Sequence, residues 1–446
     1  MDILGLIPTF GNAAWTIVAF IAALSIIVAV HEYGHYIIGR LSGIHAEVFS
    51  LGFGPVIYSR VDKRGTKWQI AALPFGGYVK FLGDADAASG KDGAVISTLS
   101  DADRRRTMHG APLWARAATV MAGPAFNFLF AILVFMGFFL SYGIATDAPA
   151  VGTLKPLPFE GQTLQPGDQI LAVNGKPTPD QETYFAVIKD APLTPTTDYL
   201  VRRAGAEVTV PGPFPFPPIV DAVSPRSAAM EAGIEAGDVI LSVDGTPIVA
   251  FDQMPAIVEA SGGKTMALQV WRAGEVFDAE LTPRRSDLPK AGGGFETRWM
   301  LGLSGSGGFF TPEVRTPGPW ETVTLAVDQV WYMTTTTLSA LWHMVTGAIS
   351  ACNISGPIGM AETMGDAARG GLEMFVQTLA MFSVGIGLMN LFPIPVLDGG
   401  HLVFHVWEAI TGKPPSDGAL RILMTGGLAA LLSLMVFALT NDLFCP

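Results

Sequence analysis

The chain has 446 residues, of which 50% are hydrophobic and only 15% are charged, and its formal net charge is −12. This composition excludes an intrinsically disordered chain, because such chains combine low hydrophobicity with high charge density. The two cysteines exclude a disulfide framework, and the negative charge argues against nucleic acid as a partner. We therefore expect an integral membrane protein with a sizeable soluble part.

Four uncharged apolar stretches are long enough to cross a bilayer, which takes about 20 residues. They lie at residues 4–30, 117–146, 374–396 and 422–440. A fifth apolar stretch, 329–349, contains His343 and a run of threonines. The first stretch lacks the basic start and the cleavage site of a secretory signal, so we expect it to be retained as a helix.

Basic residues are concentrated in one loop. Residues 1–14 contain no Lys or Arg, the segment 40–116 contains eleven, and the tail after residue 440 contains none. Loops rich in Lys and Arg stay on the cytoplasmic side of a membrane. We therefore expect both termini and the long middle section on the outer side.

The section between the second and third stretches contains an internal repeat. Residues 166–177 (PGDQILAVNGKP) match residues 236–247 (AGDVILSVDGTP) at an offset of seventy. Gly-Asp opens a turn into an apolar strand, and Asn-Gly or Asp-Gly then forms a tight hairpin, because both residue types tolerate positive φ. The pattern resembles the PDZ domain, which binds peptides by adding a strand at a sheet edge. Two alternatives stay open: the repeats bind peptide C-termini, or they only exclude large molecules.

A metal-binding pattern lies at the end of the first stretch, where His31, Glu32 and His35 form His-Glu-x-x-His. Residues four apart share one face of a helix, so both imidazoles can bind one metal ion while Glu32 stands beside them as a general base. Zinc suits two histidines and one carboxylate. Ionisable residues at membrane depth are costly and usually functional. The alternative is a polar helix end that reaches headgroup water.

The expected third ligand is Asp398, within the segment 390–401 (NLFPIPVLDGGH). Two prolines break the helix there, and two glycines permit a tight turn. Non-helical backbone at membrane depth is tolerated only where it is buried in protein or faces a water-filled cavity. An Asp that merely caps a turn is the alternative. His401 and His405 are competing ligands that rank lower, because they lie further past the break.

These motifs resemble those of the site-2 protease family of intramembrane zinc metalloproteases, and most closely the bacterial RseP group, over essentially the whole chain. The resemblance rests on HEYGH at 31–35, GPAFN at 123–127, SGPIG at 355–359 and NLFPIPVLDGGH at 390–401. It implies one zinc ion held by His31, His35 and Asp398, with Glu32 as the general base. It also implies that Asn390 contacts the substrate or aids the transition state.

The metal site decides between four and five spans. His31 and His35 approach the inner side at the end of the first span, and Asp398 reaches the same depth only if its own span also runs inward. A crossing at 329–349 would reverse that direction. We therefore expect this stretch to be a helix on the outer face, packed on the PDZ domains or on the membrane surface.

The inner loop has strand-like alternation at 46–50, 67–72 and 78–82. The second and third of these segments resemble the membrane-associated β-hairpin of the family. A substrate helix that unwinds beside the zinc could pair with a strand edge, so we expect Gly76, Gly77 and Tyr78 to contact substrate. A hairpin that only caps the fold is the alternative. The arginine run in this loop is expected to bind anionic lipid headgroups.

The expected fold is a mainly α-helical membrane protein, in which four transmembrane helices form a site-2 protease core beside a membrane-associated β-hairpin region and two periplasmic, β-rich α+β PDZ domains. The expected segments are 1–40 (first span), 41–112 (cytoplasmic-side loop with hairpins), 113–146 (second span), 147–215 and 216–288 (PDZ domains), 289–370 (periplasmic linker with the surface helix), 371–398 (third span), 399–420 (cytoplasmic loop) and 421–441 (fourth span).

The expected function is that of an intramembrane zinc endopeptidase of the bacterial inner membrane, with both termini periplasmic. By resemblance, its substrates are single-span membrane proteins of the anti-sigma factor type, cut second in sigma-E envelope stress signalling, with remnant signal peptides as another class. One alternative is a membrane-anchored PDZ adaptor with a structural metal site, for which Glu32 would be dispensable. A metal transporter is disfavoured, because the four spans contain no repeat of the kind transporters often show.

Overall fold

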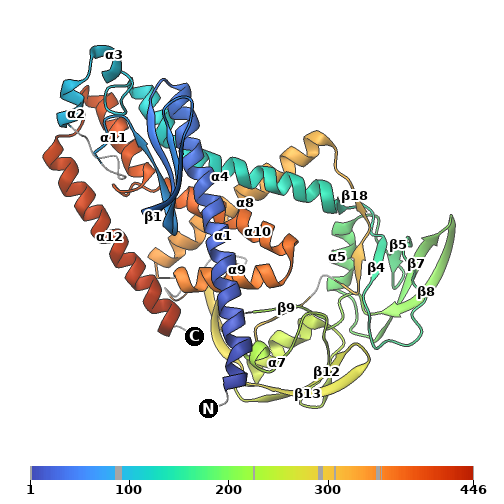
Figure 1. Cartoon of the computed structure of the whole chain (residues 1–446). Coiled ribbons are helices and arrows are strands. Elements are labelled where there is room, and N and C mark those ends of the chain that lie inside the picture. Colours follow the sequence, from blue (N-terminus) through green and yellow to red (C-terminus); the bar gives the residue numbers. More distant parts are fainter. Residues whose placement is uncertain are drawn as a thin grey trace. The chain divides into compact units, whose positions relative to one another are not determined.

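The computed structural model describes residues 3–85, 93–224, 227–289, 295–305, 308–347, 352 and 354–444. The chain forms two compact units (Figure 1). The helical unit comprises Met1–Phe138, Pro319–Val345 and Ala351–Cys445, and the strand unit comprises mainly Phe139–Gly318. The division follows the composition, because the long apolar stretches lie in the first unit and the sequence repeat lies in the second.

Among the described residues, four helices, all in the helical unit, are long and apolar enough to cross a membrane, as predicted. The helices are α1 (Ile3–Leu41), α4 (Leu113–Tyr142), α10 (Leu372–Asn390) and α12 (Asp417–Phe444). The shortest, α10, has 19 residues, which at about 1.5 Å per residue is close to the thickness of a bilayer core of about 30 Å. Residues 329–345 of the fifth apolar stretch lie in α8 (Pro319–Val345), which is not among the described helices that are long and apolar enough to cross a membrane, and residues 348–349 of the stretch lie outside the described residues.

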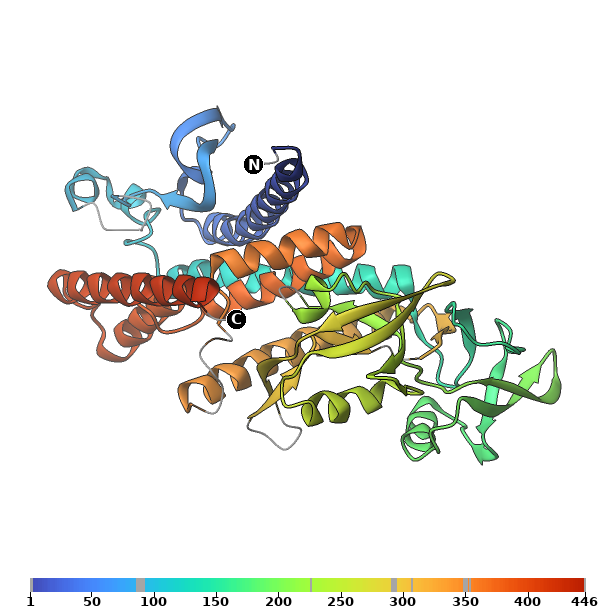
Figure 2. The ribbon, with the colours of Figure 1, turned by 90° about the horizontal axis from the view of Figure 1, so that it is seen from below.

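The N-terminal part of α1 packs against two later helices. Ala19, Ala23 and Ile27 of α1 bury their side chains against Met364 and Leu379, which belong to α9 (Pro357–Arg369) and α10. Figure 2 shows α9 and α10 side by side. These contacts leave the other end of α1, which carries the histidines, to meet α4 and the strands.

The segment between α1 and α4 forms a long hairpin of β1 (Ala46–Val61) and β2 (Lys67–Phe81), followed by the short helices α2 (Gly93–Thr98) and α3 (Asp101–Arg104). Residues 46–51 of β1 pair with residues 77–81 of β2 and also with 67–70. Within the described pairings, residues 77–81 pair on one side only. Phe49 and Val79 pack in one core with Tyr36 of α1, which places this strand edge beside the histidine end of α1.

A break separates α10 from α11 (Asp398–Thr411), as the prolines predict. Asn390 ends α10, and Asp398 is the first residue of α11. A Cβ atom on Gly399 or Gly400 would lie 2.3 Å from a backbone carbonyl oxygen of the preceding loop. Only glycine therefore allows the first turn of α11 to pack on that loop.

The sequence repeat is also a structural repeat, because the two sheets of the strand unit have the same strand order. Asn174 and Asp244 have φ angles of 48° and 47°, and the following Gly175 and Gly245 have φ angles of 76° and 77°, so the predicted tight hairpins are confirmed. The sheets, each in its strand order, are β6 (Lys176–Pro177), β5 (Gln169–Val173), β7 (Thr196–Arg203) and β8 (Ala206–Pro213), and β11 (Thr246–Pro247), β10 (Val239–Val243), β12 (Met266–Arg272) and β13 (Glu275–Leu281). Among the described residues, the short helices α5 (Gln181–Lys189), α6 (Ala228–Glu231), η1 (Phe251–Gln253, a 3-10 helix) and α7 (Met254–Ala260) accompany them.

The chain that follows the second repeat returns to pair with both repeats. First β16 (Leu303–Gly305) pairs with β9 (Val220–Val223), and then β17 (Phe310–Pro312) pairs with β4 (Val151–Leu154). Phe309, next to β17, is fully buried in the core of the first repeat. Part of the segment that we expected to be a linker, 289–370, therefore completes the two repeats. Two further antiparallel pairs are β14 (Arg284–Pro289) with β15 (Phe295–Met300) and β3 (Ile144–Ala145) with β18 (Val314–Arg315).

Candidate active site

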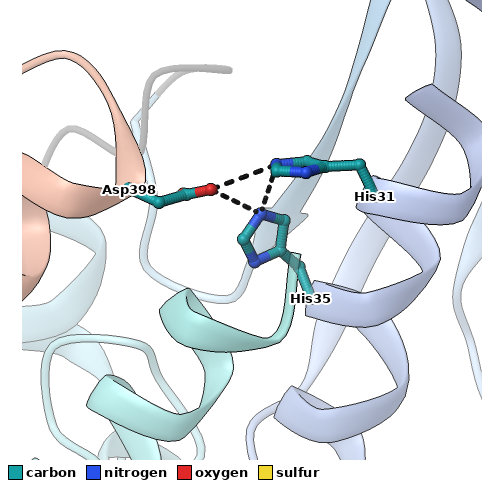
Figure 3. Close-up of side chains that lie close together, drawn as sticks. All are labelled: His31, His35 and Asp398. Carbon is teal, nitrogen blue, oxygen red and sulfur yellow. Dashed lines mark hydrogen bonds and ion pairs between the residues drawn. The ribbon is translucent and has the colours of Figure 1, made fainter. Parts of the chain in front are cut away.

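Three side-chain atoms converge where the C-terminal half of α1 meets the start of α11 (Figure 3). The Nε2 atom of His31 lies 3.1 Å from Nε2 of His35 and 3.1 Å from Oδ2 of Asp398, and Nε2 of His35 lies 3.4 Å from the same oxygen. A tetrahedral ion with bonds of about 2.0–2.1 Å keeps its ligand atoms about 3.3 Å apart. The spacing of the three atoms therefore suits one such ion.

The helical period and two glycines create this arrangement. His31 and His35 are one turn apart, so their rings leave the same face of α1. A Cβ atom on Gly123 of α4 would lie 2.3 Å from Nε2 of His35 and 2.7 Å from Nε2 of His31. A Cβ atom on Gly34 would lie 2.4 Å from the carbonyl oxygen of Ala122. Two glycines thus allow α1 and α4 to pack closely and leave room for the two imidazoles.

The third donor atom is a buried carboxylate oxygen. Apart from its contacts with Nε2 of His31 and His35, Oδ2 of Asp398 has no hydrogen-bond partner among the described residues. Burying a carboxylate is costly, and a metal ion bound by all three atoms would offset that cost. Two imidazole nitrogens and one carboxylate oxygen form the donor set of catalytic zinc sites, so the residues present fit zinc.

A cavity of about 640 Å³ adjoins the three donor atoms. Glu32, Gly77, Tyr78 and Asn390 line it, together with the three candidate ligands. A Cβ atom on Gly77 would lie 3.2 Å from Cγ of Glu32, so β2 passes directly beside the expected base. The structure therefore brings these four predicted residues to one place.

Gly76 differs from its neighbours, because it does not line this cavity. It adopts a φ angle of +137°, and a Cβ atom there would lie 2.6 Å from Cε2 of Phe53. The ring of Phe53 stacks on that of Tyr78, with the centroids 5.9 Å apart. Gly76 thus permits the turn and the ring packing that bring Gly77 and Tyr78 to the cavity.

The comparisons with known proteins agree with this geometry. Peptidase family M50 matches residues 19–434. The chain belongs to peptidase family M50. It is 36% identical to a Rhizobium meliloti (strain 1021) protein with a zinc metalloprotease name, over 97% of both chains. It is 33% identical to the regulator of sigma E protease of Haemophilus influenzae, over 96% of this chain and 98% of the relative.

Two further similarities complete the comparison. The chain is 32% identical to the regulator of sigma-E protease RseP of Salmonella typhimurium, over 96% of this chain and 98% of the relative. Among solved structures, the PDZ domain of an SdrC-like protein of Listeria monocytogenes covers 20% of this chain at 16% identity, with a TM-score of 0.16. The family and the relatives establish this M50 member as a zinc metalloprotease.

The competing ligands considered for this M50 protein lie in the same cavity but outside the three-atom group. His401 and His405 line the cavity, whereas Asp398 alone joins the two histidines of α1 among the described residues. Asp398 is the first residue of α11, so its carboxylate can reach across the break, while His401 lies one turn further along the helix.

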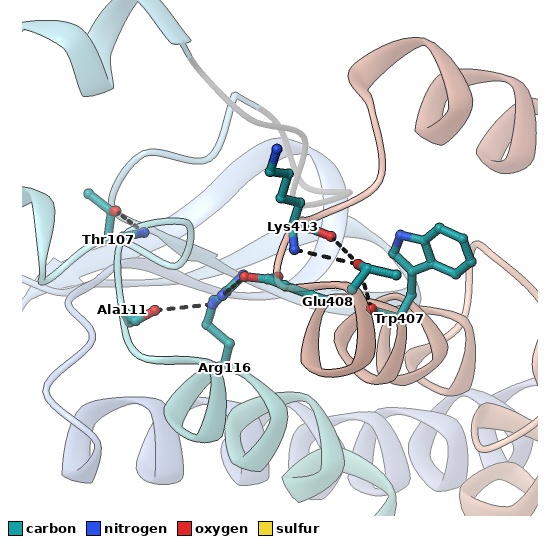
Figure 4. A network of polar contacts seen from close by, with 8 residues as sticks. Thr107, Ala111, Arg116, Trp407, Glu408 and Lys413 are labelled. Carbon is teal, nitrogen blue, oxygen red and sulfur yellow. Dashed lines mark hydrogen bonds and ion pairs between the residues drawn. The ribbon is translucent and has the colours of Figure 1, made fainter.

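Two polar contacts near the site have no signal in the sequence. Nδ1 of His35 lies 2.8 Å from the carbonyl oxygen of Thr119 in α4. Arg116 at the start of α4 forms a bidentate ion pair with Glu408 of α11 (Figure 4). Because α11 begins with Asp398, this ion pair holds α11, and with it the candidate metal ligand Asp398, against α4. The two partners are 292 residues apart in the chain, too far for a local pattern to reveal.

Proposed function

We propose that this M50 protein is an intramembrane endopeptidase that cleaves a peptide bond within or near a transmembrane segment of single-span membrane proteins. The observation that carries the proposal is the position of the donor group. His31 and His35 belong to the candidate span Ala14–Leu41, and Asp398 follows the candidate span Leu372–Asn390. A hydrolytic site at that depth suits a substrate whose scissile bond is itself in the membrane.

His31, His35 and Asp398 would hold the zinc ion, which when bound polarises the substrate carbonyl and activates water. Glu32 is the only carboxylate other than Asp398 that lines the described cavity. It takes a proton from water as the water oxygen bonds to the carbonyl carbon. It then delivers the proton to the amide nitrogen as the C–N bond breaks.

The single-sided edge of residues 77–81 supports a role in substrate binding. A helix hides its peptide bonds in internal hydrogen bonds, so a substrate must unwind to be cut. Pairing with a strand edge replaces the lost hydrogen bonds. Gly77 and Tyr78 would present that edge to the substrate beside Glu32. Gly76 would form the turn that directs this edge toward the cavity. Asn390 would contact the substrate from the other wall of the cavity.

The names of the relatives support a substrate class. Because two of them are regulators of sigma E, we propose anti-sigma factors with one span as substrates, cut second after another protease, with remnant signal peptides as a further class. The protein would lie in the bacterial inner membrane with both termini in the periplasm. The two structural repeats would be periplasmic PDZ domains that bind peptide C-termini or exclude substrates with large outer domains.

The surface of α8 supports contact with lipid. Its large apolar side chains Trp320, Trp331 and Trp342 are exposed, whereas the opposite face of the helix is buried at Ala326 and Val330. Tryptophan favours the membrane–water interface. We propose that α8 lies along the outer surface of the membrane.

The test is cleavage of a purified single-span reporter protein in detergent by wild type and by Glu32→Gln. We expect the variant to keep its zinc and to lose at least about 10²-fold in rate, the usual contribution of a general base. Equal rates would remove Glu32 from the mechanism. A zinc-loaded wild type that cleaves neither this reporter nor an anti-sigma factor would favour the adaptor with a structural metal site.

A further inference from the structure

One buried amide of α4 touches a candidate metal ligand and has no role in the mechanism above. The side chain of Asn127 is fully buried, and its Nδ2 lies 3.3 Å from Nδ1 of His31. The other atom of the same amide, Oδ1, is buried without a hydrogen-bond partner. An unpaired buried carbonyl oxygen beside an imidazole is costly.

Metal binding by His31 determines which atom of the Asn127 amide should face the His31 ring. Nε2 of His31 can bind a metal only through its lone pair, so the ring proton of neutral His31 must then reside on Nδ1. A ring Nδ1–H needs an acceptor, and the Nδ2 group of Asn127 is only a donor. A half-turn of the amide brings Oδ1 to the same position with no change in shape.

His35, the second histidine of the site, already has an acceptor at its Nδ1 atom. Nδ1 of His35 lies 2.8 Å from the carbonyl oxygen of Thr119, which can only accept a hydrogen bond. This contact keeps the proton on Nδ1 and the lone pair of Nε2 toward the metal position. Ligating histidines commonly donate their other N–H to such an outer partner, which orients the ring.

Both outer contacts come from a single stripe of α4. Thr119, Gly123 and Asn127 are spaced by four residues and therefore share one face of the helix. Thr119 contacts His35, Asn127 contacts His31, and Gly123 between them leaves room for both rings. This stripe faces His31 and His35, which have the same spacing on α1. The first and last residues of the GPAFN motif, Gly123 and Asn127, therefore both lie beside the candidate metal ligands.

We propose that Asn127 is a positioning residue, which accepts a hydrogen bond from Nδ1–H of His31 through Oδ1 and thereby holds His31 as a metal ligand. A separate hydrogen bond, from the Ser383 hydroxyl of α10 to the backbone carbonyl oxygen of Asn127 over 3.0 Å, does not involve the side-chain amide. The proposal rests on the zinc site of the proposed function and adds the residue that orients one of its ligands.

The experiment measures zinc retention in the full-length protein in detergent, dialysed against graded concentrations of a chelator. The variants are Asn127→Leu, which removes the acceptor, and Asn127→Asp, which keeps an acceptor and cannot donate. Ser383→Ala is the matched control, because it removes a buried polar contact of the same residue without touching the amide. The visible spectrum of the cobalt(II)-substituted protein reports on the ligand set independently of activity.

We expect Asn127→Leu to bind zinc about 10- to 100-fold more weakly than wild type and to alter the cobalt spectrum. Asn127→Asp should stay closer to wild type than to Asn127→Leu, and Ser383→Ala should bind zinc as wild type does. Zinc affinity in Asn127→Leu equal to that of wild type would overturn the proposal. So would equal losses in the Leu and Asp variants, because a required donor is absent from both.

Two controls keep these outcomes separate from other failures. If Asn127→Leu does not fold, Asn127→Asp decides alone, since the carboxylate has nearly the same shape as the amide: retained zinc supports the acceptor role, and lost zinc rejects it. A wild-type protein that binds no zinc would instead refute the metal site of the proposed function.

Discussion

Arg116 and Glu408 join two helices that carry opposite sides of the site. Nη2 of Arg116 lies 2.6 Å from Oε1 of Glu408, and Nη1 lies 3.0 Å from Oε2. Arg116 also donates from Nε to the carbonyl oxygen of Ala111 over 3.1 Å. The two charged side chains are only 14% and 18% exposed, so water screens their attraction weakly. The pair therefore fixes α11, and with it Asp398, against α4.

The first prediction concerns this ion pair. Arg116→Leu should destabilise the helical unit by about 2–3 kcal/mol, because it leaves the Glu408 carboxylate partly buried without its partner. Thermal unfolding of the protein in detergent measures the effect. Adding Glu408→Leu should recover part of the loss, since the double variant has no unpaired charge. Strictly additive losses would show that the two residues do not interact.

The second prediction concerns the space at Gly123. Gly123→Ala should cost at least about tenfold in zinc affinity while the protein still folds, because the added methyl group meets the ends of two histidine rings and not the backbone. The rings can turn away, but only by leaving the metal position. Zinc content by atomic spectroscopy checks this outcome. Gly137→Ala on the same helix, where the added Cβ meets no atom within 4 Å, should leave the zinc content unchanged, and equal zinc in both variants would contradict the packing argument.

The third prediction concerns the pH dependence of the strand unit. Burial by itself raises the pKa of the Asp168 carboxyl, but hydrogen bonds from the Arg203 guanidinium and from Gln165 N–H outweigh it, so the pKa lies below its ordinary value of 3.8. A lowered pKa means that this contribution to stability is complete above pH 3.8 and is lost as the pH falls through the folded-state value. We expect the strand unit to lose stability in this acidic range.

The variant Asp168→Asn tests the assignment. It should cost about 1–3 kcal/mol near neutral pH, because it weakens two charge-assisted hydrogen bonds to Arg203, of 2.7 and 2.6 Å. The loss should shrink as the pH falls below 3.8 and through the lower folded-state pKa, where the wild-type carboxyl is itself protonated. Chemical unfolding followed between pH 2.5 and 7 measures both effects. A loss that does not change with pH would mean that Asp168 acts through packing.

The fourth prediction concerns the SGPIG segment. The Asp442 carboxylate of α12 accepts hydrogen bonds from the backbone N–H groups of Gly356, Ile358 and Gly359, at 2.8, 3.0 and 3.2 Å. It thus caps the start of α9 from another helix, and Asp442→Ala should cost about 1–2 kcal/mol. Thr440→Ala, which removes a hydroxyl bonded only within its own helix, should shift the unfolding temperature much less. Equal shifts of the unfolding temperature in the two variants would contradict the capping role of Asp442.

Much of the site was predictable from sequence, because its metal-binding residues follow from short local patterns. The four-residue spacing of His31 and His35 determines that their rings share a helix face, whatever packs around them. The apolar stretches determine which helices can span a membrane, and Asn-Gly and Asp-Gly determine the hairpins at Asn174 and Asp244. Each of these features depends on residues within one turn or one span of each other.

Contacts between distant segments were decided only by the tertiary structure. No local pattern indicates that Thr119 and Asn127 contact the two histidines, that Arg116 meets Glu408, or that β17 pairs with β4. The same holds for Gly76, which shapes a turn and does not line the cavity. Hydrogen bonds and steric fit depend on which helix faces are brought together, and that choice is made by packing of the whole unit. The sequence by itself thus determined the metal chemistry, and the tertiary structure decided which residues of α4 orient it.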